Sequence, residues 1–151
     1  MAPCYLFVYG TLRKGCANDL CRKFPGALLL GEGTVQGSLF ELEGLPYPGL
    51  LLDGAGPVAG EVYAVDGETV HRLDEFEGFY PGRSADSYYF RREADVQLEG
   101  GTLRCFVYET NPRKLPLGGA IEPADWKRYL ERHPAVARRT ETWPEDLAGL
   151  D

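Results

Sequence analysis

Metal-binding and redox motifs are scarce in this chain. Its 151 residues include four cysteines and two histidines, and no two cysteines have the Cys-x-x-Cys spacing. These residues are Cys4, Cys16, Cys21, Cys105, His71 and His133. A zinc site needs three or four such ligands at short spacings, so we expect no metal, no cofactor and four reduced thiols. Cys16 as a nucleophile stays open, although the sequence offers it no clear histidine partner.

Long apolar runs and an excess of basic residues are also missing. No stretch approaches the roughly 18 apolar residues that a membrane span needs, and the N-terminus lacks the pattern of a secretion signal. We therefore expect a cytoplasmic protein. The net charge of −7 and the isoelectric point near 4.9 argue against binding to nucleic acid, which needs basic stripes. A small molecule is the expected partner, and the oligomeric state stays open.

The residues that are present predict one domain made mainly of short strands. A chain of this length can bury one core, and glycine and proline occur along all of it. We expect strands at residues 5–9, 35–42, 59–65, 88–98 and 102–108, helices at 66–78 and 125–132, and a loop at 44–56. We expect residues 99–101 to form a hairpin turn between the last two strands. The prediction is an α+β domain, compact and single, with a small mixed β-barrel or sheet and a few short helices.

The first expected strand ends at a glycine, where the chain becomes small, polar and basic. Gly10 follows Tyr9 and precedes Thr11 and Leu12. Glycine permits a tight turn and a close approach of the backbone to a ligand. Backbone amides after such a turn can converge on one oxygen. We therefore predict an anion-binding turn here.

The expected helix at residues 66–78 carries an inward carboxylate. Asp66 can cap its start and Gly78 can end it. At about 100° per residue, Val70, Leu73 and Glu77 share one face, and Glu75 points away from it. Burial and the negative end of the helix dipole both disfavour the ionised form of Glu77. A carboxyl with a raised pKa can transfer protons at neutral pH, whereas a solvated glutamate in the last turn is the ordinary alternative.

His71 and Glu75 are the closest approach to a metal site in this helix. They lie four residues apart and can share a metal or form a surface pair. Two ligands on one exposed face are more often a surface pair, so we favour that interpretation.

Two motifs, taken together, resemble the gamma-glutamylcyclotransferase-like family. They are Tyr-Gly-Thr-Leu-Arg at residues 9–13 and Leu-Asp-Glu-Phe-Glu-Gly at residues 73–78. Further segments that fit the same pattern lie at 60–63, 89–92 with Val96, and 125–130. The last of these resembles the closing helix of the small members that act on gamma-glutamylamines. The resemblance covers roughly residues 4 to 132, so we assign residues 1–134 to the domain and 135–151 to a C-terminal tail or covering arm.

The resemblance implies a compact α+β fold with a cavity at the mouth of a small barrel. It implies that a gamma-glutamyl amide cyclises to 5-oxoproline and frees an amine or amino acid, with no metal or organic cofactor. Carried over by position, Glu77 is the catalytic acid/base, and the substrate-binding residues are Tyr9, Gly10, Thr11, Leu12 and Arg13. Two segments depart from the family pattern: the longer loop at 79–83, and the tail.

Some assignments keep an alternative at this stage. Arg13 can pair with the substrate carboxylate or form a structural ion pair. Tyr88 or Tyr89 can hydrogen-bond near Glu77 or belong to the core. An enzyme of the same fold that removes a gamma-glutamyl protecting group from a biosynthetic intermediate is one rival function. A catalytically silent binding module for small molecules or proteins is the other, and loss of the inward glutamate would identify it.

Overall fold

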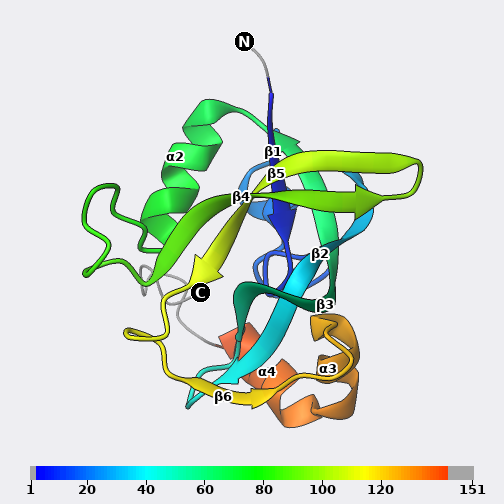
Figure 1. Ribbon diagram of the computed structural model, residues 1–151. Coiled ribbons are helices and arrows are strands. Elements are labelled where there is room, and N and C mark those ends of the chain that lie inside the picture. The colour runs from blue at the N-terminus through cyan, green and yellow to red at the C-terminus, as the bar shows by residue number, and fades with distance from the viewer. Residues whose placement is uncertain (1–2, 143–151) are drawn as a thin grey trace.

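The computed structural model describes residues 3–142 as a barrel with helices at its side and one end (Figure 1). Its strands are β1 (Cys4–Val8), β2 (Leu28–Leu42), β3 (Pro48–Val65), β4 (Tyr89–Leu98), β5 (Gly101–Thr110) and β6 (Leu117–Ala120). Its helices are α1 (Leu20–Lys23), α2 (Gly67–Phe76), α3 (Trp126–Arg132) and α4 (Pro134–Thr142). None of the helices described in this range is long and apolar enough to cross a membrane.

Five strands close into the barrel. The hydrogen-bonded order is β3-β1-β5-β4-β2, and β2 also pairs with β3, which completes the ring. β6 extends the sheet by pairing with β2. The β1–β5 pairing is parallel, whereas the other pairings are antiparallel. This architecture confirms the expected α+β domain with a small mixed barrel.

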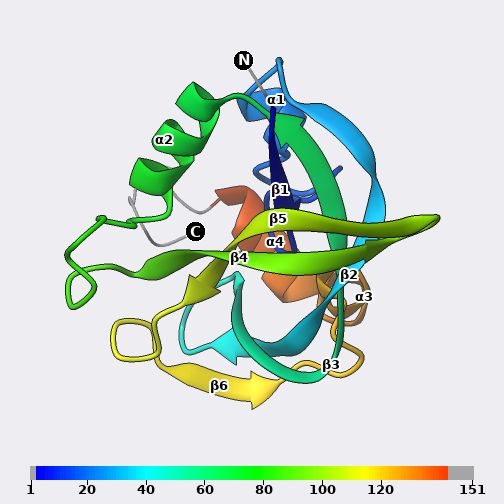
Figure 2. The same cartoon turned by 45° about the horizontal axis from the view of Figure 1, so that its top comes forward.

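The β4–β5 hairpin follows the sequence pattern closely. Leu98 pairs with Gly101, so Glu99 and Gly100 form the turn. Gly100 has a φ of 91°, a conformation that glycine adopts at little cost. Figure 2 shows this hairpin crossing the barrel and extending past its side.

The prediction of a loop at residues 44–56 is wrong over most of this range, because β3 begins at Pro48. Proline is tolerated at the first residue of a strand. One glycine of this region, Gly49, packs closely against β2, because a Cβ atom there would lie 2.8 Å from Leu42 Cδ2. A Cβ atom on Gly37 would lie 2.4 Å from the carbonyl oxygen of Leu51, so only glycine lets the two strands pair here.

Helix α2 has the ends that the sequence predicts. The Asp66 side chain accepts a hydrogen bond from the Thr69 N–H at 2.8 Å, and Gly78, with a φ of 65°, follows the last turn. Val70 and Leu73 are buried, and both belong to a core cluster that includes residues of β1, β3 and β5. This packing fixes the helix against the side of the barrel (Figures 1 and 2).

Helices α3 and α4 lie together at one end of the barrel, near β6 (Figure 1). The side chain of Asp125 caps α3 by accepting hydrogen bonds from the backbone N–H groups of Lys127 and Arg128. α4 follows at once, and its Arg139 donates a hydrogen bond to the carbonyl of Gly44 at 2.9 Å. The domain boundary at residue 134 stays a prediction. Residues 143–151 of the expected tail lie outside the described residues.

Candidate active site

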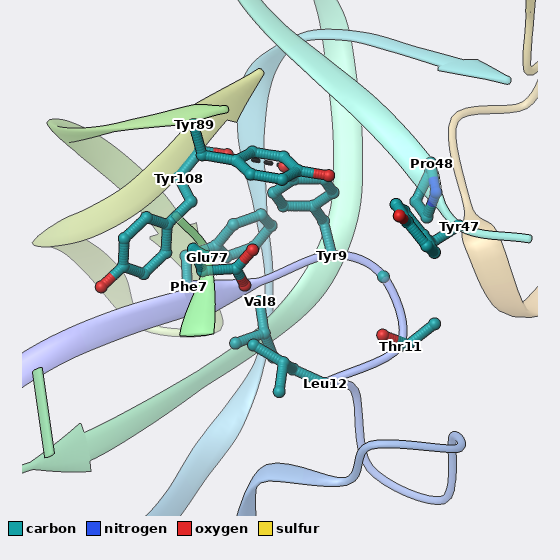
Figure 3. A pocket seen from close by; sticks show the side chains of 11 residues that line it. Phe7, Val8, Tyr9, Thr11, Leu12, Tyr47, Pro48, Glu77, Tyr89 and Tyr108 are labelled. Carbon is teal, nitrogen blue, oxygen red and sulfur yellow. Dashed lines mark hydrogen bonds between the residues drawn. The ribbon is translucent and has the colours of Figure 1, made fainter. Parts of the chain in front are cut away.

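A pocket opens where β1 ends, beside the C-terminal end of α2 (Figure 3). About 30 Å³ of it is open to the centres of water molecules. It is lined by Phe7, Val8, Tyr9, Gly10, Thr11, Leu12, Tyr47, Pro48, Glu77, Tyr89 and Tyr108. Five of the six residues assigned to the site from the sequence therefore meet here, from two motifs more than sixty residues apart.

The turn after β1 forms one wall of the pocket. It is closed by a hydrogen bond of 3.0 Å from the Arg13 N–H to the Gly10 carbonyl. Asn18 fixes Thr11 from both sides: its N–H donates to the Thr11 carbonyl at 2.9 Å, and its side-chain amide donates to Thr11 Oγ1 at 3.0 Å. A Cβ atom on Gly10 would lie 3.0 Å from Pro48, so glycine keeps the turn close to the opposite wall.

Glu77 lies at the C-terminal cap of α2 and is 4% exposed. Its N–H donates to the Leu73 carbonyl at 2.8 Å, which continues the helical geometry that orients the side chain inward. Figure 3 shows the carboxylate pointing toward Tyr9, with Tyr47 and Pro48 on the far side of the pocket. Glu75 is 74% exposed, so the helix separates the two carboxylates as its periodicity predicts.

Tyr9 connects the floor of the pocket to β5. Its hydroxyl donates to the backbone carbonyl of Tyr108 at 2.6 Å (Figure 3). Burial, and then the negative charge of Glu77, hold the pKa of Tyr9 well above its usual value of 10.0. Tyr9 therefore stays neutral and presents an aromatic face beside the Glu77 carboxylate.

A buried polar network braces α2 from behind the pocket. The Tyr108 hydroxyl donates to Asp74 Oδ1 at 2.7 Å, and Arg91 pairs with Asp74 Oδ2. The Arg91 guanidinium also lies 4.8 Å from the ring centre of Phe106. Burial, and then the hydrogen bond to Asp74, raise the pKa of Tyr108. Because Asp74 lies three residues before Glu77, these contacts hold the last turn of α2 against β4 and β5.

Arg13 is the one assigned site residue that the structure does not bring into the pocket. Its side chain is 3% exposed and pairs with Glu61 at 2.6 Å and with Asp125 at 2.9 Å. Glu61 also accepts the Lys14 N–H at 2.8 Å. The guanidinium is thus engaged in a buried ion pair outside the pocket, and its assignment to substrate binding stays a prediction.

Besides Tyr9, three further tyrosines line the pocket, and none of them belongs to the motif at residues 9–13. Tyr89 is one of the two that the sequence left open, whereas Tyr88 does not line the pocket. Tyr47 and Tyr108 were not expected there. Their approach depends on pairing between distant strands, and no local spacing in the sequence signals it.

The candidate metal and thiol groups lie elsewhere. His71 and Glu75 form an exposed pair at 3.6 Å, and no group of three or more potential metal ligands occurs among residues 3–142. Cys16 does not line the pocket, and burial raises the pKa of its thiol. A raised pKa disfavours the thiolate that a nucleophilic cysteine needs.

Comparisons with known proteins point to one family. The model of the family described as "Gamma-glutamyl cyclotransferase, AIG2-like" matches residues 6–128. A protein of Niallia circulans named "Gamma-L-glutamyl-butirosin B gamma-glutamyl cyclotransferase" is 37% identical over 143 residues, which cover 94% of this chain and 87% of the relative.

Solved structures agree on the fold. An AIG2-like protein from Mus musculus superimposes with a TM-score of 0.62 at 28% identity, over 81% of this chain and 90% of the mouse chain. YkqA from Bacillus subtilis superimposes with a TM-score of 0.67 at 26% identity. That match covers 89% of this chain but 43% of YkqA.

Proposed function

Because this chain belongs to the AIG2-like gamma-glutamyl cyclotransferase family, we propose that it converts a gamma-glutamyl amide to 5-oxoproline and a free amine. The amide is that of a gamma-glutamylamine or a gamma-glutamyl amino acid. The observation that carries this proposal is the buried Glu77 carboxylate, which lines one pocket with the turn at Gly10.

Glu77 acts as the general acid/base in this proposal. The substrate's own α-amine attacks its γ-carbonyl carbon and forms the five-membered ring. Glu77 accepts the proton that the amine loses and then donates it to the leaving nitrogen as the C–N bond of the amide breaks.

The turn after β1 stabilises the oxyanion that forms on the γ-carbonyl oxygen. Backbone amides from Gly10 to Leu12 are the proposed donors, and the hydrogen bonds of Asn18 to Thr11 hold that backbone in place before the substrate arrives. Donors fixed in advance stabilise developing charge without reorganising during the reaction.

The small pocket fits an intramolecular reaction. Its 30 Å³ corresponds to roughly two or three water positions, so we propose that it encloses the reacting atoms while the leaving group extends outward. Holding the amine and carbonyl of one molecule together supplies a large part of the rate. The steps need a carboxylate and amide donors, so the proposed reaction is independent of metals and cofactors.

The relative from Niallia circulans favours a second candidate function. Its name describes cyclotransfer from gamma-L-glutamyl-butirosin B. We therefore propose, as the second candidate, that this chain removes a gamma-glutamyl protecting group from a biosynthetic intermediate by the same cyclisation. The buried Glu77 supports either enzyme over a catalytically silent module of this fold.

The test is release of 5-oxoproline from a mixture of gamma-glutamylamines, gamma-glutamyl amino acids and larger gamma-glutamyl amides. We expect release from at least one class, with a stoichiometric amount of amine. Absence of 5-oxoproline from every compound, with the protein folded, would support the silent module instead.

A further inference from the structure

A second cavity adjoins the pocket of Glu77 through a shared residue. Tyr47 lines both cavities. The second lies between the end of β2, the segment that follows it, and helices α3 and α4. About 260 Å³ of it is open to the centres of water molecules, which makes it far larger than the pocket of Glu77.

The charges on the walls of this cavity are mainly negative. Glu41 and Glu43 line it, as does Arg139. The Arg139 guanidinium donates to the carbonyl of Gly44 at 2.9 Å, and the Tyr129 hydroxyl donates to Glu41 Oε2. The cavity wall thus carries two carboxylates and one guanidinium, and the guanidinium already binds a backbone carbonyl. This balance of charge suits a cationic ligand.

Trp126 adds an independent sign of a ligand. It lines the cavity and is 1% exposed, yet its indole Nε1 has no hydrogen-bond partner among the described residues. Buried N–H groups are normally paired, so this donor is available to an acceptor oxygen on a ligand. The stacked ring of Tyr129, whose centre lies 5.0 Å from that of Trp126, gives the same region an aromatic surface.

We propose that this cavity binds the amine leaving group of the substrate. The group carries a further ammonium, which pairs with Glu41 and Glu43, and an ether or hydroxyl oxygen, which accepts from Trp126 Nε1. This inference rests on the proposed function and deepens it by naming the substrate class. Because Tyr47 borders both cavities, a chain leaving the γ-carbonyl carbon in the first can pass over that ring into the second.

Three synthetic gamma-glutamyl amides of similar length test the two features separately. The first is the amide of 2,2'-oxybis(ethylamine), which has a terminal ammonium and an ether oxygen. The second, from 2-propoxyethylamine, replaces the ammonium with a methyl group. The third, from 1,5-diaminopentane, replaces the oxygen with a methylene group. We expect kcat/KM for the first to exceed each of the others by about fivefold, the factor that roughly 1 kcal/mol gives.

Matched variants assign each preference to its residue. Glu43→Gln and Glu41→Gln are expected to reduce the preference for the ammonium, and Trp126→Phe the preference for the oxygen. Glu93→Gln is the control, since Glu93 is an exposed residue of β4 that lines neither cavity. Melting temperatures show whether each variant is folded.

Binding of the free diamine ether separates failure of the inference from failure of the proposed function. We expect 2,2'-oxybis(ethylamine) to shift the indole N–H resonance of Trp126, identified by its loss in Trp126→Phe, whether or not any amide is turned over. Equal kcat/KM for all three amides would overturn the inference while leaving the cyclotransferase intact. If no amide is turned over, an indole resonance that the free diamine ether leaves unshifted would overturn the inference about this cavity.

Discussion

Arg13 and Glu61 form a buried ion pair, with Nη2 and Oε2 2.6 Å apart and both side chains 3% exposed. Asp125 joins the pair from the start of α3. These contacts therefore tie the turn after β1 to β3 and to Asp125, the N-cap of α3. The ion pair holds the turn after β1 in place without itself lining the pocket.

We predict that Arg13→Gln lowers stability much more than it changes the KM of the folded enzyme. Removing one partner leaves the Glu61 carboxylate buried and without its guanidinium, which typically costs about 3–5 kcal/mol. Urea unfolding measures the stability loss, and kinetics below the unfolding transition measure KM. Arg104→Gln, which removes an exposed pair with Asp95, is the control and should be nearly neutral. A large rise in KM at unchanged stability would restore Arg13 to substrate binding.

We predict that Gly10→Val weakens substrate binding. A Cβ atom at this position would lie 3.0 Å from Pro48, and a β-branched side chain adds two methyl groups there, so the turn must move. Gly26→Val is the matched control, because a Cβ atom on Gly26 meets nothing within 4 Å. Titration of 5-oxoproline into each folded variant measures the effect. Unchanged affinity in Gly10→Val would exclude this turn from the binding site.

The sequence predicts the local parts of this structure better than the long-range ones. The caps of α2 and the face shared by Leu73 and Glu77 depend on neighbours within one helix, so periodicity predicts them. The start of β3 and the approach of Tyr108 to the pocket depend on strand pairing across the barrel. The ion pair of Arg13 also depends on long-range pairing, because Glu61 lies 48 residues away in the sequence.

We predict that stability falls as pH rises above about 10. Tyr9 and Tyr108 have folded-state pKa values above the usual 10.0, chiefly because of burial. Between the unfolded and folded pKa values the unfolded chain releases protons that the folded chain retains, so unfolding becomes more favourable with increasing pH. The stabilisation is fully present below pH 10 and is lost through the higher folded pKa values. Tyr9→Phe should reduce the slope of unfolding free energy against pH in this window, and an unchanged slope would contradict the assignment.

We predict that activity survives both a strong chelator and a thiol-alkylating reagent. The proposed reaction uses the substrate amine as nucleophile, and Cys16 lies outside the pocket with a raised thiol pKa. The assay is release of 5-oxoproline after each treatment. Loss to the chelator with recovery in zinc would show a metal requirement, whereas loss in step with alkylation of Cys16, prevented by substrate, would show a nucleophilic cysteine.

Glu77→Gln tests the central claim most directly. The amide keeps the shape of the buried side chain but cannot accept a proton, and loss of a general acid/base typically lowers kcat by about 10²-fold or more. Glu75→Gln, on the exposed side of the same helix, is the matched control. We predict that Glu77→Gln releases almost no 5-oxoproline at a near-normal melting temperature, while Glu75→Gln retains activity. Near wild-type turnover in folded Glu77→Gln would contradict the account.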